Sequence, residues 1–468
     1  MTPCPSLLRK LSISLLTPAV FLACSHVQQR VPSSDGAVSQ ASQTAGIEQG
    51  SESLASVEDT EAAGAGHRHG LNEGRPWGFS RKMLRGLYVN GVETPTFAFL
   101  KTAKSSIDIE IYEMNDRDFR AQLREALDRG VHVRVVKDPN PVGEKCKFFD
   151  VVDEAKDDED CQDLKSLVTE IKESPEGAFV PFNKAELCGI PGKSCFEHGK
   201  MIIVDGKAAL LSTGNFNGSN LCNQNQNPKI CNRDYSYVTH DREVVRTLTS
   251  IFEHDLEGKA YDLPSLMAPG IEEKLTVSPY SLAPLVKFIL SARESIEIEN
   301  QYLKEPQINQ ALIAASKSGI KVSLTVASLC AFGKPKKTQL QRIAALFTPF
   351  DEAGISTRLF TSTMTVGGRA GYLHAKAIIV DGKYAWVGSV NGSTTSVSQN
   401  REYGIFFRNP AMVQHLRNVI VADHAHPQSE SWQESVLCTK DHATRIAPSD
   451  PKELGAFDPE ESTANTGE

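Results

Sequence analysis

Two patterns of apolar residues alternate along the chain. One repeats every second residue, as in a strand with one buried face, and the other has the three-to-four-residue spacing of a helix. The expected strands are 106–112, 131–136, 295–299 and 320–326. The expected helices are 97–104, 119–129, 282–292 and 307–318. Strands that alternate with helices predict an α/β fold, and the same order of elements occurs in both parts of the chain.

One longer sequence is present twice. Residues 198–215 read HGKMIIVDGKAALLSTGN and residues 374–391 read HAKAIIVDGKYAWVGSVN, with ten of the 18 aligned positions identical. A shorter echo follows each copy, Asn-Arg-Asp-Tyr at 232–235 and Asn-Arg-Glu-Tyr at 400–403. Each copy thus has a histidine, a lysine, an asparagine and a carboxylate at matched positions. This repetition predicts one site built from two half-sites.

Each copy is expected to form a β-hairpin. The apolar, β-branched run 201–204 predicts a buried strand, and Asp205-Gly206 is a strong signal for a two-residue turn. With those two residues as the turn, Val204 faces Lys207 and His198 faces Thr213. The histidine, lysine and asparagine of the motif then share one face of the hairpin, because side chains alternate along a strand.

Eight side chains are candidates for chemistry at this site. They are His198, Lys200, Asn215, Asp234, His374, Lys376, Asn391 and Glu402. Imidazole, ammonium and carboxamide groups together suit a phosphate, because lysine supplies charge and asparagine a neutral donor. Asp205 and Asp381 lie at the far ends of the hairpins and are expected to form turns. A packed hairpin with incidental polar residues would explain one copy, but two matched copies disfavour it.

The pattern His-x-Lys-x4-Asp-x6-Gly-[Ser/Thr]-x-Asn resembles the signature of the phospholipase D superfamily, and two copies in one chain are typical of its monomeric members. The second copy matches throughout, whereas the first has Ser212-Thr213 in place of Gly-Ser. The resemblance covers roughly residues 77–425. It implies an α/β fold of two similar halves with mixed sheets, packed in pseudo-twofold fashion with the active site at their interface. Residues 298–302, Ile-Glu-Asn-Gln-Tyr, also resemble a segment of lipid-cleaving members.

The resemblance implies a two-histidine phosphodiesterase. One imidazole attacks phosphorus to form a phosphohistidine, and the other protonates the leaving alcohol. The residues alone leave the two roles open, and the resemblance makes His198 the nucleophile and His374 the acid. Asp234 and Glu402 are expected to orient the imidazoles, as the carboxylate of a catalytic triad does. The scheme requires no metal and no cofactor.

Charge and composition bear on the substrate. The chain has a formal net charge of −8, so long-range attraction to nucleic acid is weak. Phospholipid is the expected substrate, with hydrolysis or headgroup exchange as the outcome. The alternatives are an endonuclease, a cardiolipin-synthase-like transferase and, less favoured, an inactive surface-binding protein. A nuclease should line its cleft with Lys and Arg, whereas a lipid enzyme should offer apolar rims.

The N-terminal region predicts export. Arg9-Lys10 precedes an apolar run too short to span a bilayer, and Phe21-Leu22-Ala23-Cys24 resembles a bacterial lipobox. The predicted domains are a signal peptide (1–23), a flexible linker (24–76), two halves (77–265 and 266–425) and a C-terminal tail (426–468). An outer-membrane or periplasmic lipoprotein is expected, alternatively a secreted protein. It should act as a monomer in peripheral contact with a membrane.

Ten cysteines become eight if Cys4 is removed with the signal peptide and Cys24 is acylated. An even number in an exported protein suggests disulfides. Pairing of neighbours gives Cys146–Cys161, Cys188–Cys195, Cys222–Cys231 and a long-range Cys330–Cys438, although other connectivities stay open. Cys222–Cys231 is favoured because it would hold together a polar insertion between Asn215 and Asp234.

Overall fold

Residues 84–440 of the chain, apart from 92–93, 143–145, 147–156, 191–192 and 332, are described by a computed structural model. The predicted signal peptide, the predicted linker and residues 441–468 of the predicted tail lie outside these described residues.

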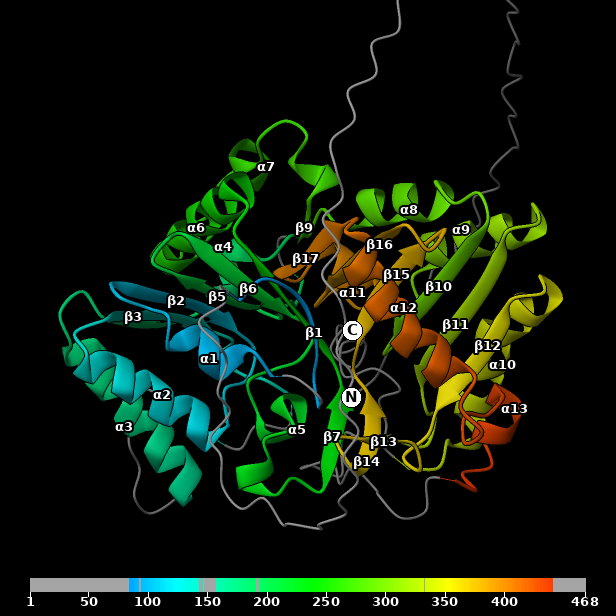
Figure 1. The fold of residues 1–468 in the computed structure, drawn as a ribbon, viewed down its shortest axis with the longest axis horizontal. Helices are drawn as coiled ribbons and strands as arrows, with labels where there is room; N and C mark the ends of the chain where they lie inside the picture. Colours follow the sequence, from blue (N-terminus) through cyan, green and yellow to red (C-terminus); the bar gives the residue numbers. More distant parts are fainter. Residues whose placement is uncertain are drawn as a thin grey trace, which may run out of the picture. The chain divides into compact units, whose positions relative to one another are not determined.

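Two seven-stranded mixed sheets carry the fold (Figure 1). The strands of the first are β1 Gly86–Val89, β2 Ser106–Ile111, β3 His132–Lys137, β4 Ala178–Pro181, β5 Lys200–Val204, β6 Ala208–Ser212 and β8 Tyr235–Thr239. Those of the second are β9 Leu275–Ser278, β10 Ser295–Asn300, β11 Lys321–Ala327, β12 Ser356–Phe360, β15 Lys376–Val380, β16 Tyr384–Gly388 and β17 Glu402–Phe407. The order β1-β8-β6-β5-β2-β3-β4 repeats as β9-β17-β16-β15-β10-β11-β12, so the predicted duplication extends over both whole sheets.

Helices cover both sheets. In the first half they are α1 Thr96–Leu100, α2 Arg117–Asp128, α3 Glu159–Glu173, α4 Lys184–Leu187, α5 Gly218–Leu221, α6 Arg242–Glu257 and α7 Leu263–Leu266. In the second they are α8 Leu282–Leu290, α9 Pro306–Lys317, α10 Lys337–Glu352, α11 Thr394–Ser398, α12 Pro410–His424 and α13 Trp432–Ser435. The strands and helices expected from the apolar patterns are present. The first helix ends at Leu100 instead of 104, because the backbone N–H groups of Lys104 and Ser105 donate to Asp205.

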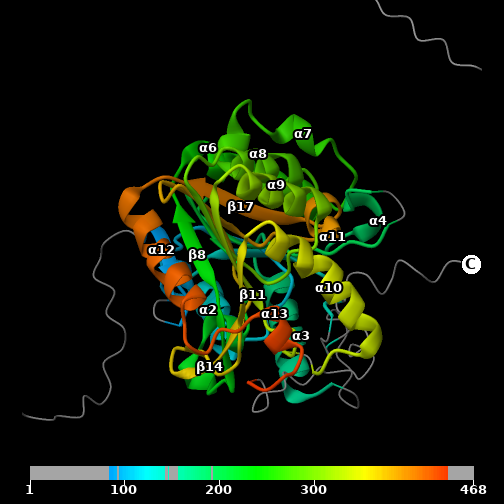
Figure 2. The same cartoon turned by 90° about the vertical axis from the view of Figure 1, so that its right-hand side faces the viewer.

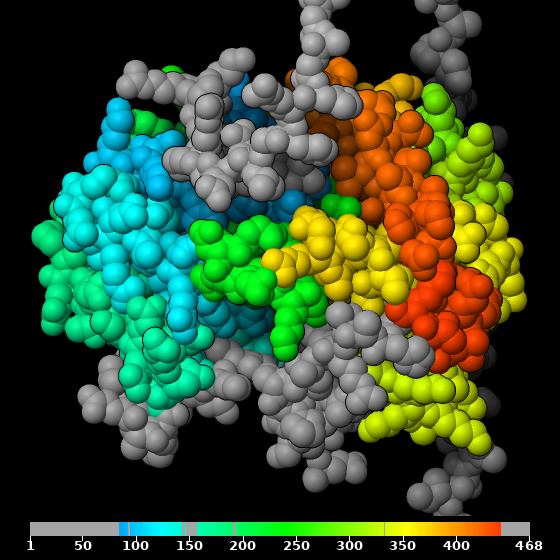
Figure 3. Space-filling model, turned by 60° about the horizontal axis from the view of Figure 1, so that its bottom comes forward, coloured from blue at the N-terminus to red at the C-terminus, as the bar shows by residue number. Residues whose placement is uncertain are grey.

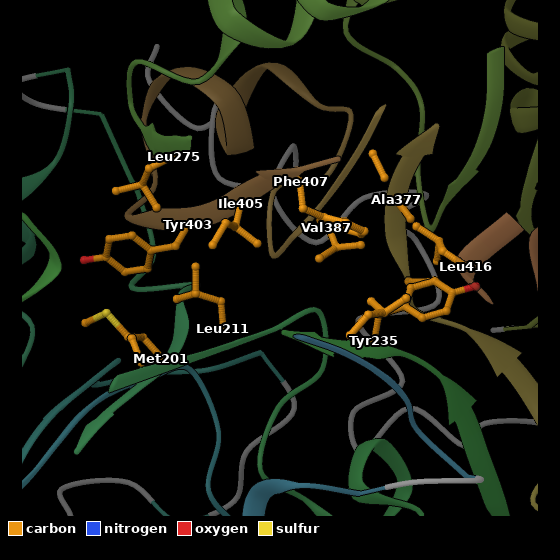
Figure 4. Close-up of a cluster of buried hydrophobic side chains, with 14 of the residues drawn as sticks. Met201, Leu211, Tyr235, Leu275, Ala377, Val387, Tyr403, Ile405, Phe407 and Leu416 are labelled. Carbon is orange, nitrogen blue, oxygen red and sulfur yellow. The ribbon is translucent and has the colours of Figure 1, made fainter. Parts of the chain in front are cut away.

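Alternation along the strands divides the apolar side chains between two kinds of core. Ile202 and Leu210 pack with α1, α2 and α3 on the outer face of the first sheet. Met201 and Leu211 point the other way, into a core that both halves share. Figure 4 shows them facing Tyr403 and Ile405 of the second half. This shared core joins the halves over their sheet faces, so that the strand ends of both can contribute to one site.

A third, three-stranded sheet crosses between the halves. It consists of β7 Ile230–Arg233, β13 Thr365–Val366 and β14 Arg369–Leu373, with β14 parallel to β7. In Figure 3 the yellow segment that contains β13 and β14 abuts the green segment around β7. The echo Asn-Arg-Asp-Tyr at 232–235 and the residue before His374 are thereby brought side by side.

The hairpin turn is one residue longer than predicted. Val204 pairs with Ala208 and not with Lys207, and Val380 pairs with Tyr384. Asp205 and Gly206 both have positive φ, as a tight hairpin turn requires, but Lys207 is drawn into the loop by donating to the carbonyl of Val204. The predicted pairing of His198 with Thr213 is therefore wrong by one position.

All four predicted disulfides are present: Cys146–Cys161, Cys188–Cys195, Cys222–Cys231 and Cys330–Cys438. The last one ties residue 438 to the second half, and Glu430 forms a β-bridge with Leu359. Residues 426–440 were assigned to the tail by the sequence, but they pack with the second half. Among the described helices, none is long and apolar enough to cross a bilayer.

Candidate active site

The two motif histidines stand at equivalent places, each directly before the strand that opens with the motif lysine. The backbone N–H of His198 donates to the carbonyl of Arg401 at 2.9 Å, and that of His374 donates to the carbonyl of Arg233 at 3.2 Å. Each bond joins one half to the other. The residue after each arginine is a predicted carboxylate, so the backbone places every histidine beside the carboxylate of the opposite half.

Each imidazole faces a carboxylate across the interface between the halves. His374 Nδ1 is hydrogen-bonded to Asp234 Oδ1 at 3.0 Å. His198 Nδ1 lies 3.1 Å from Glu402 Oε2, without the alignment of a hydrogen bond. Both carboxylates are fully buried, and both histidines are 8% exposed. The structure thus places each predicted carboxylate at an imidazole, and each one comes from the other half.

The carboxylates are themselves held by small polar side chains. Asp234 accepts from Thr213 Oγ1 at 2.6 Å and from Asn220 Nδ2 at 2.7 Å. Glu402 accepts from Asn400 Nδ2 at 3.0 Å and from the hydroxyl of Ser396. Sequence reasoning missed Asn220 and Ser396. They occupy short helices, α5 and α11, whose sequences do not match, so the comparison of the two copies gave no signal for them.

The motif lysines lie next to the imidazoles. Lys376 Nζ is 3.3 Å from both ring nitrogens of His374 and donates to Gln301 Oε1 at 3.1 Å. Lys200 Nζ donates to the carbonyl of His198 and lies 5.4 Å from the ring centroid of Tyr112. Gln301 belongs to the segment 298–302 that the sequence singled out. That segment therefore contributes a direct partner of the second lysine.

The asparagines are placed less directly. Asn215 Nδ2 donates to Glu113 Oε2 at 3.0 Å, while its Oδ1 is buried without a hydrogen-bond partner. The backbone N–H of Asn391 donates to the Ser396 hydroxyl that holds Glu402. Asn391 Oδ1 is also buried and unpaired. Because the turn is one residue longer, the predicted pairing no longer places the asparagines on the hairpin face of the histidine and lysine. Among the described contacts, neither asparagine side chain bonds to a histidine.

Burial and mutual charge lower the pKa of both histidines and of Lys200. Burial, followed by Lys200 and Lys376, brings the pKa of His198 well below its usual value. Burial and Lys376 lower the pKa of His374 to about 4, against the opposing charge of Asp234. Burial lowers the pKa of Lys200 to about 8. Because the lysine of each half acts on the histidine of the other, the two half-sites form one electrostatic unit.

The two carboxylates differ in charge state. Burial alone would raise the pKa of Asp234, but the charges of His374 and Lys376 hold it below the ordinary value. Burial raises the pKa of Glu402 to about 7, with Lys200 opposing the shift. At neutral pH Asp234 is ionised and Glu402 is close to half-protonated. The pseudo-twofold symmetry is therefore broken in the chemistry, although it holds in the fold.

Buried ion pairs join the two halves. Arg401 binds Asp255 of α6 with Nε–Oδ2 2.6 Å, and Arg233 binds Asp423 of α12 with Nε–Oδ2 2.6 Å. Both pairs cross the interface between the halves. Their arginines, Arg401 and Arg233, immediately precede Glu402 and Asp234 in the chain. Two buried hydrogen bonds between a tyrosine and a glutamate cross it as well, Tyr403–Glu110 and Tyr235–Glu299. These polar contacts fix the register at which the two histidines meet.

The one departure from the motif has a packing explanation. A Cβ on Gly388 would lie 2.5 Å from Gly404 Cα and 2.8 Å from the Trp386 ring. In the first half the equivalent neighbours of Ser212 are Ser236 and Leu210, and the Ser212 hydroxyl accepts from Ser236. Replacement of the tryptophan by leucine leaves room for a side chain at Ser212. The substitution therefore alters the sheet beneath the site and leaves the histidine face unchanged.

No group of three or more His, Cys, Asp or Glu side chains within the described part of the chain is arranged to hold a metal ion.

Comparison with known proteins agrees with this geometry. The family model "Cardiolipin synthase, PLD-like domain" matches residues 97–256 and 285–423, which is more than half of the chain. A cardiolipin synthase of Halalkalibacterium halodurans is 26% identical over 358 residues, covering 71% of this chain and 64% of the relative. The probable cardiolipin synthase YwiE of Bacillus subtilis is 25% identical over 352 residues, covering 70% and 63%. The chain thus spans a little under two thirds of the length of these relatives.

A solved structure supports the fold. The phosphatidylserine synthase of Haemophilus influenzae superimposes with a TM-score of 0.50 at 14% identity, covering 75% of this chain and 89% of that one. At this identity the likeness concerns the fold alone. Together with the family match over both halves and the paired His-x-Lys motifs that meet across the interface, it leads to one conclusion: this chain belongs to the phospholipase D superfamily, in its two-motif form.

Proposed function

We propose that this protein is a phosphatidyltransferase that cleaves a phospholipid through a covalent phosphohistidine and passes the phosphatidyl group to an alcohol. The observation that carries the proposal is the convergence of His198 and His374, each with a buried carboxylate from the opposite half at Nδ1 and a lysine bonded to its backbone carbonyl. Such a pair offers a nucleophile and a proton donor to a single phosphodiester.

The first step breaks the bond between phosphorus and the headgroup oxygen. His198 Nε2 attacks phosphorus while His374 gives its proton to the departing oxygen. In the second step His374 takes the proton of the acceptor alcohol, whose oxygen attacks phosphorus and expels His198. Lys200 and Lys376 balance the charge that develops on the phosphate oxygens.

The unequal carboxylates support these roles. A nucleophilic imidazole must be neutral, and the lowered pKa of His198 keeps it so at pH 7. An imidazole that acts as acid must hold a proton. Burial and Lys376 lower the pKa of His374 to about 4, and the ionised, hydrogen-bonded Asp234 opposes this shift, so Asp234 together with the negative charge of a bound phosphodiester would favour the protonated form. Glu402, with its pKa raised to about 7, stabilises a cation less well at His198. The asymmetry agrees with the roles that the family resemblance implied.

An alcohol as acceptor is favoured over water by the comparisons. The matching family model and the relatives carry the name cardiolipin synthase. The residues at the site are equally compatible with water, which would give hydrolysis.

A lipid is favoured over nucleic acid by the arginines next to the site. Arg233 and Arg401 flank the two carboxylates, yet each is buried and bound to an aspartate, so neither can pair with a polyanion. The cations beside the imidazoles are Lys200 and Lys376, a set suited to one phosphate.

The test uses the full-length chain with mixed phospholipid vesicles, EDTA and an excess of glycerol. Loss of headgroup release in His198→Ala and in His374→Ala, but not in the exposed control His415→Ala, is the expected result. Phospholipid labelled at phosphorus should leave label on the chain after acid-free denaturation, except in His198→Ala.

The reaction products then identify whether the acceptor is an alcohol or water. A glycerol-linked phosphatidyl product supports transfer, whereas phosphatidic acid alone, even in excess glycerol, would replace the transferase by a hydrolase. No turnover of any lipid, together with histidine-dependent cleavage of DNA or RNA in a parallel reaction, would overturn the lipid assignment.

A further inference from the structure

Helix α8 exposes apolar side chains that no described part of the chain covers. Leu285 and Ile289 are buried in the core of the second half, while Leu282 and Val286 are half-buried. Tyr280, just before the helix, is 56% exposed, and Leu290 at its end is 55% exposed. In Figures 1 and 2, α8 lies beside α9 on the outer layer of the second half.

These side chains line a groove of about 940 Å³. Its walls include Tyr280, Leu282, Val286 and Leu290, with Gln307 from α9. Among the lining residues Lys287 is the one that carries a charge. We call Tyr280, Leu282, Val286, Lys287 and Leu290 the α8 face. An apolar groove with a single cation suits a molecule that is both apolar and anionic.

Exposed charges of both signs surround the α8 face. Between 279 and 321 they are Lys287, Arg293, Glu294, Lys317 and Lys321, and exposed Glu272 and Glu273 precede this segment. Glu294 is already paired with Lys383 at 3.1 Å. The α8 face itself has one cation, Lys287, and no acid, although the full chain has a net charge of −8. An apolar surface with a cation and no acid is complementary to an anionic lipid surface.

The N-terminal end of α8 is hydrogen-bonded to the elements of the candidate active site. Ser278 pairs with Glu402 at the end of β9, and its hydroxyl bonds to that of Ser281, the residue that precedes α8. Ser281 donates in turn to the carbonyl of Val397 in α11. Glu305, which caps α9, accepts from Thr394 of the same α11 at 2.6 Å. The short helix that follows Asn391 is thus bound to the N-terminal ends of both α8 and α9.

The first half treats the corresponding position differently. There the counterpart of α8 is α1, and the next helix, α2, is covered by α3 through ion pairs between Arg120 and Asp163 at 2.5 Å and between Arg124 and Glu170 at 2.8 Å. The exposed large apolar residues of the described chain include none from α1 or α2. The apolar surface therefore belongs to one half and does not follow from the duplicated fold.

We propose that the α8 face docks on a bilayer that contains anionic phospholipid, with Tyr280 and Leu290 inserted among the acyl chains and Lys287 at the headgroup phosphates. The inference deepens the proposed function, because it holds the protein at the surface in which the substrate lies.

Vesicle flotation of the full-length protein tests this inference without any turnover. Phosphatidylcholine vesicles with phosphatidylglycerol should bind the protein, and added salt should weaken the binding. Tyr280→Ser combined with Leu290→Ser should lower the partition coefficient about tenfold or more, since two apolar side chains no longer leave water. Lys287→Glu should lower it by a similar factor on anionic vesicles and little on pure phosphatidylcholine. Val421→Ser, at a residue of α12 that is 44% exposed, is the matched control, because α12 packs against the shared core and not beside α8.

A local probe removes any contribution of the N-terminal region, which all variants share. The fluorescence of Leu290→Trp should be quenched by vesicles with bromine-labelled acyl chains, and that of Val421→Trp on α12 should not. Equal binding of the double serine variant and the wild type, or an unquenched Trp at 290, would overturn the proposal. So would a dimer in vesicle-free solution that the double serine variant dissociates, because the face would then bind a second copy.

The docking test and the test of the proposed function give independent results. His198→Ala should bind vesicles as the wild type does. Binding without lipid turnover in the wild type would leave the docking surface standing and reject the enzyme activity.

Discussion

Asp234 Oδ1 lies 3.0 Å from Nδ1 of His374, and these two residues come from different halves of the molecule. Glu402 and His198 form the reciprocal contact at 3.1 Å. Neither half therefore holds a histidine together with its own carboxylate. The site exists only when the shared core docks the two sheets, which makes the chemistry depend on the interface between the halves.

The contact between Asp234 and His374 should be the more important of the two for turnover. Asp234→Asn keeps the shape of the side chain but removes the charge that stabilises a protonated imidazole, so kcat should fall by about 10²–10⁴. Glu402→Gln should cost less, because Glu402 is partly protonated near pH 7. Steady-state kinetics on phospholipid vesicles measure both. An Asp234→Asn enzyme with the larger residual kcat would reverse the roles given to the two histidines.

Lys200 should limit activity on the alkaline side. Burial lowers its pKa to about 8, so its charge is present below that pH and is lost as the pH rises through it. The value of kcat/KM, which reports the free enzyme, should fall above about pH 8. In Lys200→Arg the guanidinium stays charged, and the alkaline limb should move upward even if the maximum is lower. A profile of the wild type that stays flat to pH 10 would contradict this assignment.

Breaking a buried ion pair between the halves should destabilise the whole molecule. Asp255→Asn leaves Arg401 buried without its partner, which costs about 3–5 kcal/mol. Glu294→Gln removes an exposed pair with Lys383 and should change stability by about 0–1 kcal/mol. Urea unfolding followed by circular dichroism compares the two. Similar losses in both variants would show that the buried pair is not what holds the halves in register.

The aspartate of each motif should act on stability and not on catalysis. Asp381 has φ 55° and accepts backbone N–H groups from Arg293, Glu294 and Ser295. Asp381→Ala should lower the free energy of unfolding by about 2 kcal/mol and leave kcat near the wild-type value. Asp381→Asn, which tolerates this backbone conformation and keeps an acceptor, should lose less.

The charge of Asp381 gives the same prediction a pH dependence. Burial alone would raise its pKa, but bonds from backbone N–H groups hold it below the ordinary value. Its contribution is therefore present above the unfolded pKa and is lost as the pH falls through the folded one. The stability difference between wild type and Asp381→Ala should shrink in acid. Unfolding curves at several pH values test this, and a large loss of kcat at neutral pH would make the residue catalytic.

Several features were predictable because they depend on local pattern. Period-two runs such as Ile107-Asp108-Ile109 predicted strands, and the duplicated motif predicted that His198 and His374 share a site. The hairpin register was not predictable, since it depends on whether Lys207 joins the loop. The roles of Asn220 and Ser396 were hidden too, because they lie in segments that the two halves do not share.

The sequence by itself determined the family, the α/β class, the two half-sites and the residues that could carry the chemistry, because periodicity and motif spacing are local properties. Tertiary structure alone decided that each carboxylate lies at the histidine of the other half, that Asp234 is ionised while the pKa of Glu402 rises to about 7, and that no described residue covers the apolar face of α8. Those properties arise from burial and from contacts between residues more than a hundred positions apart, which no local pattern contains.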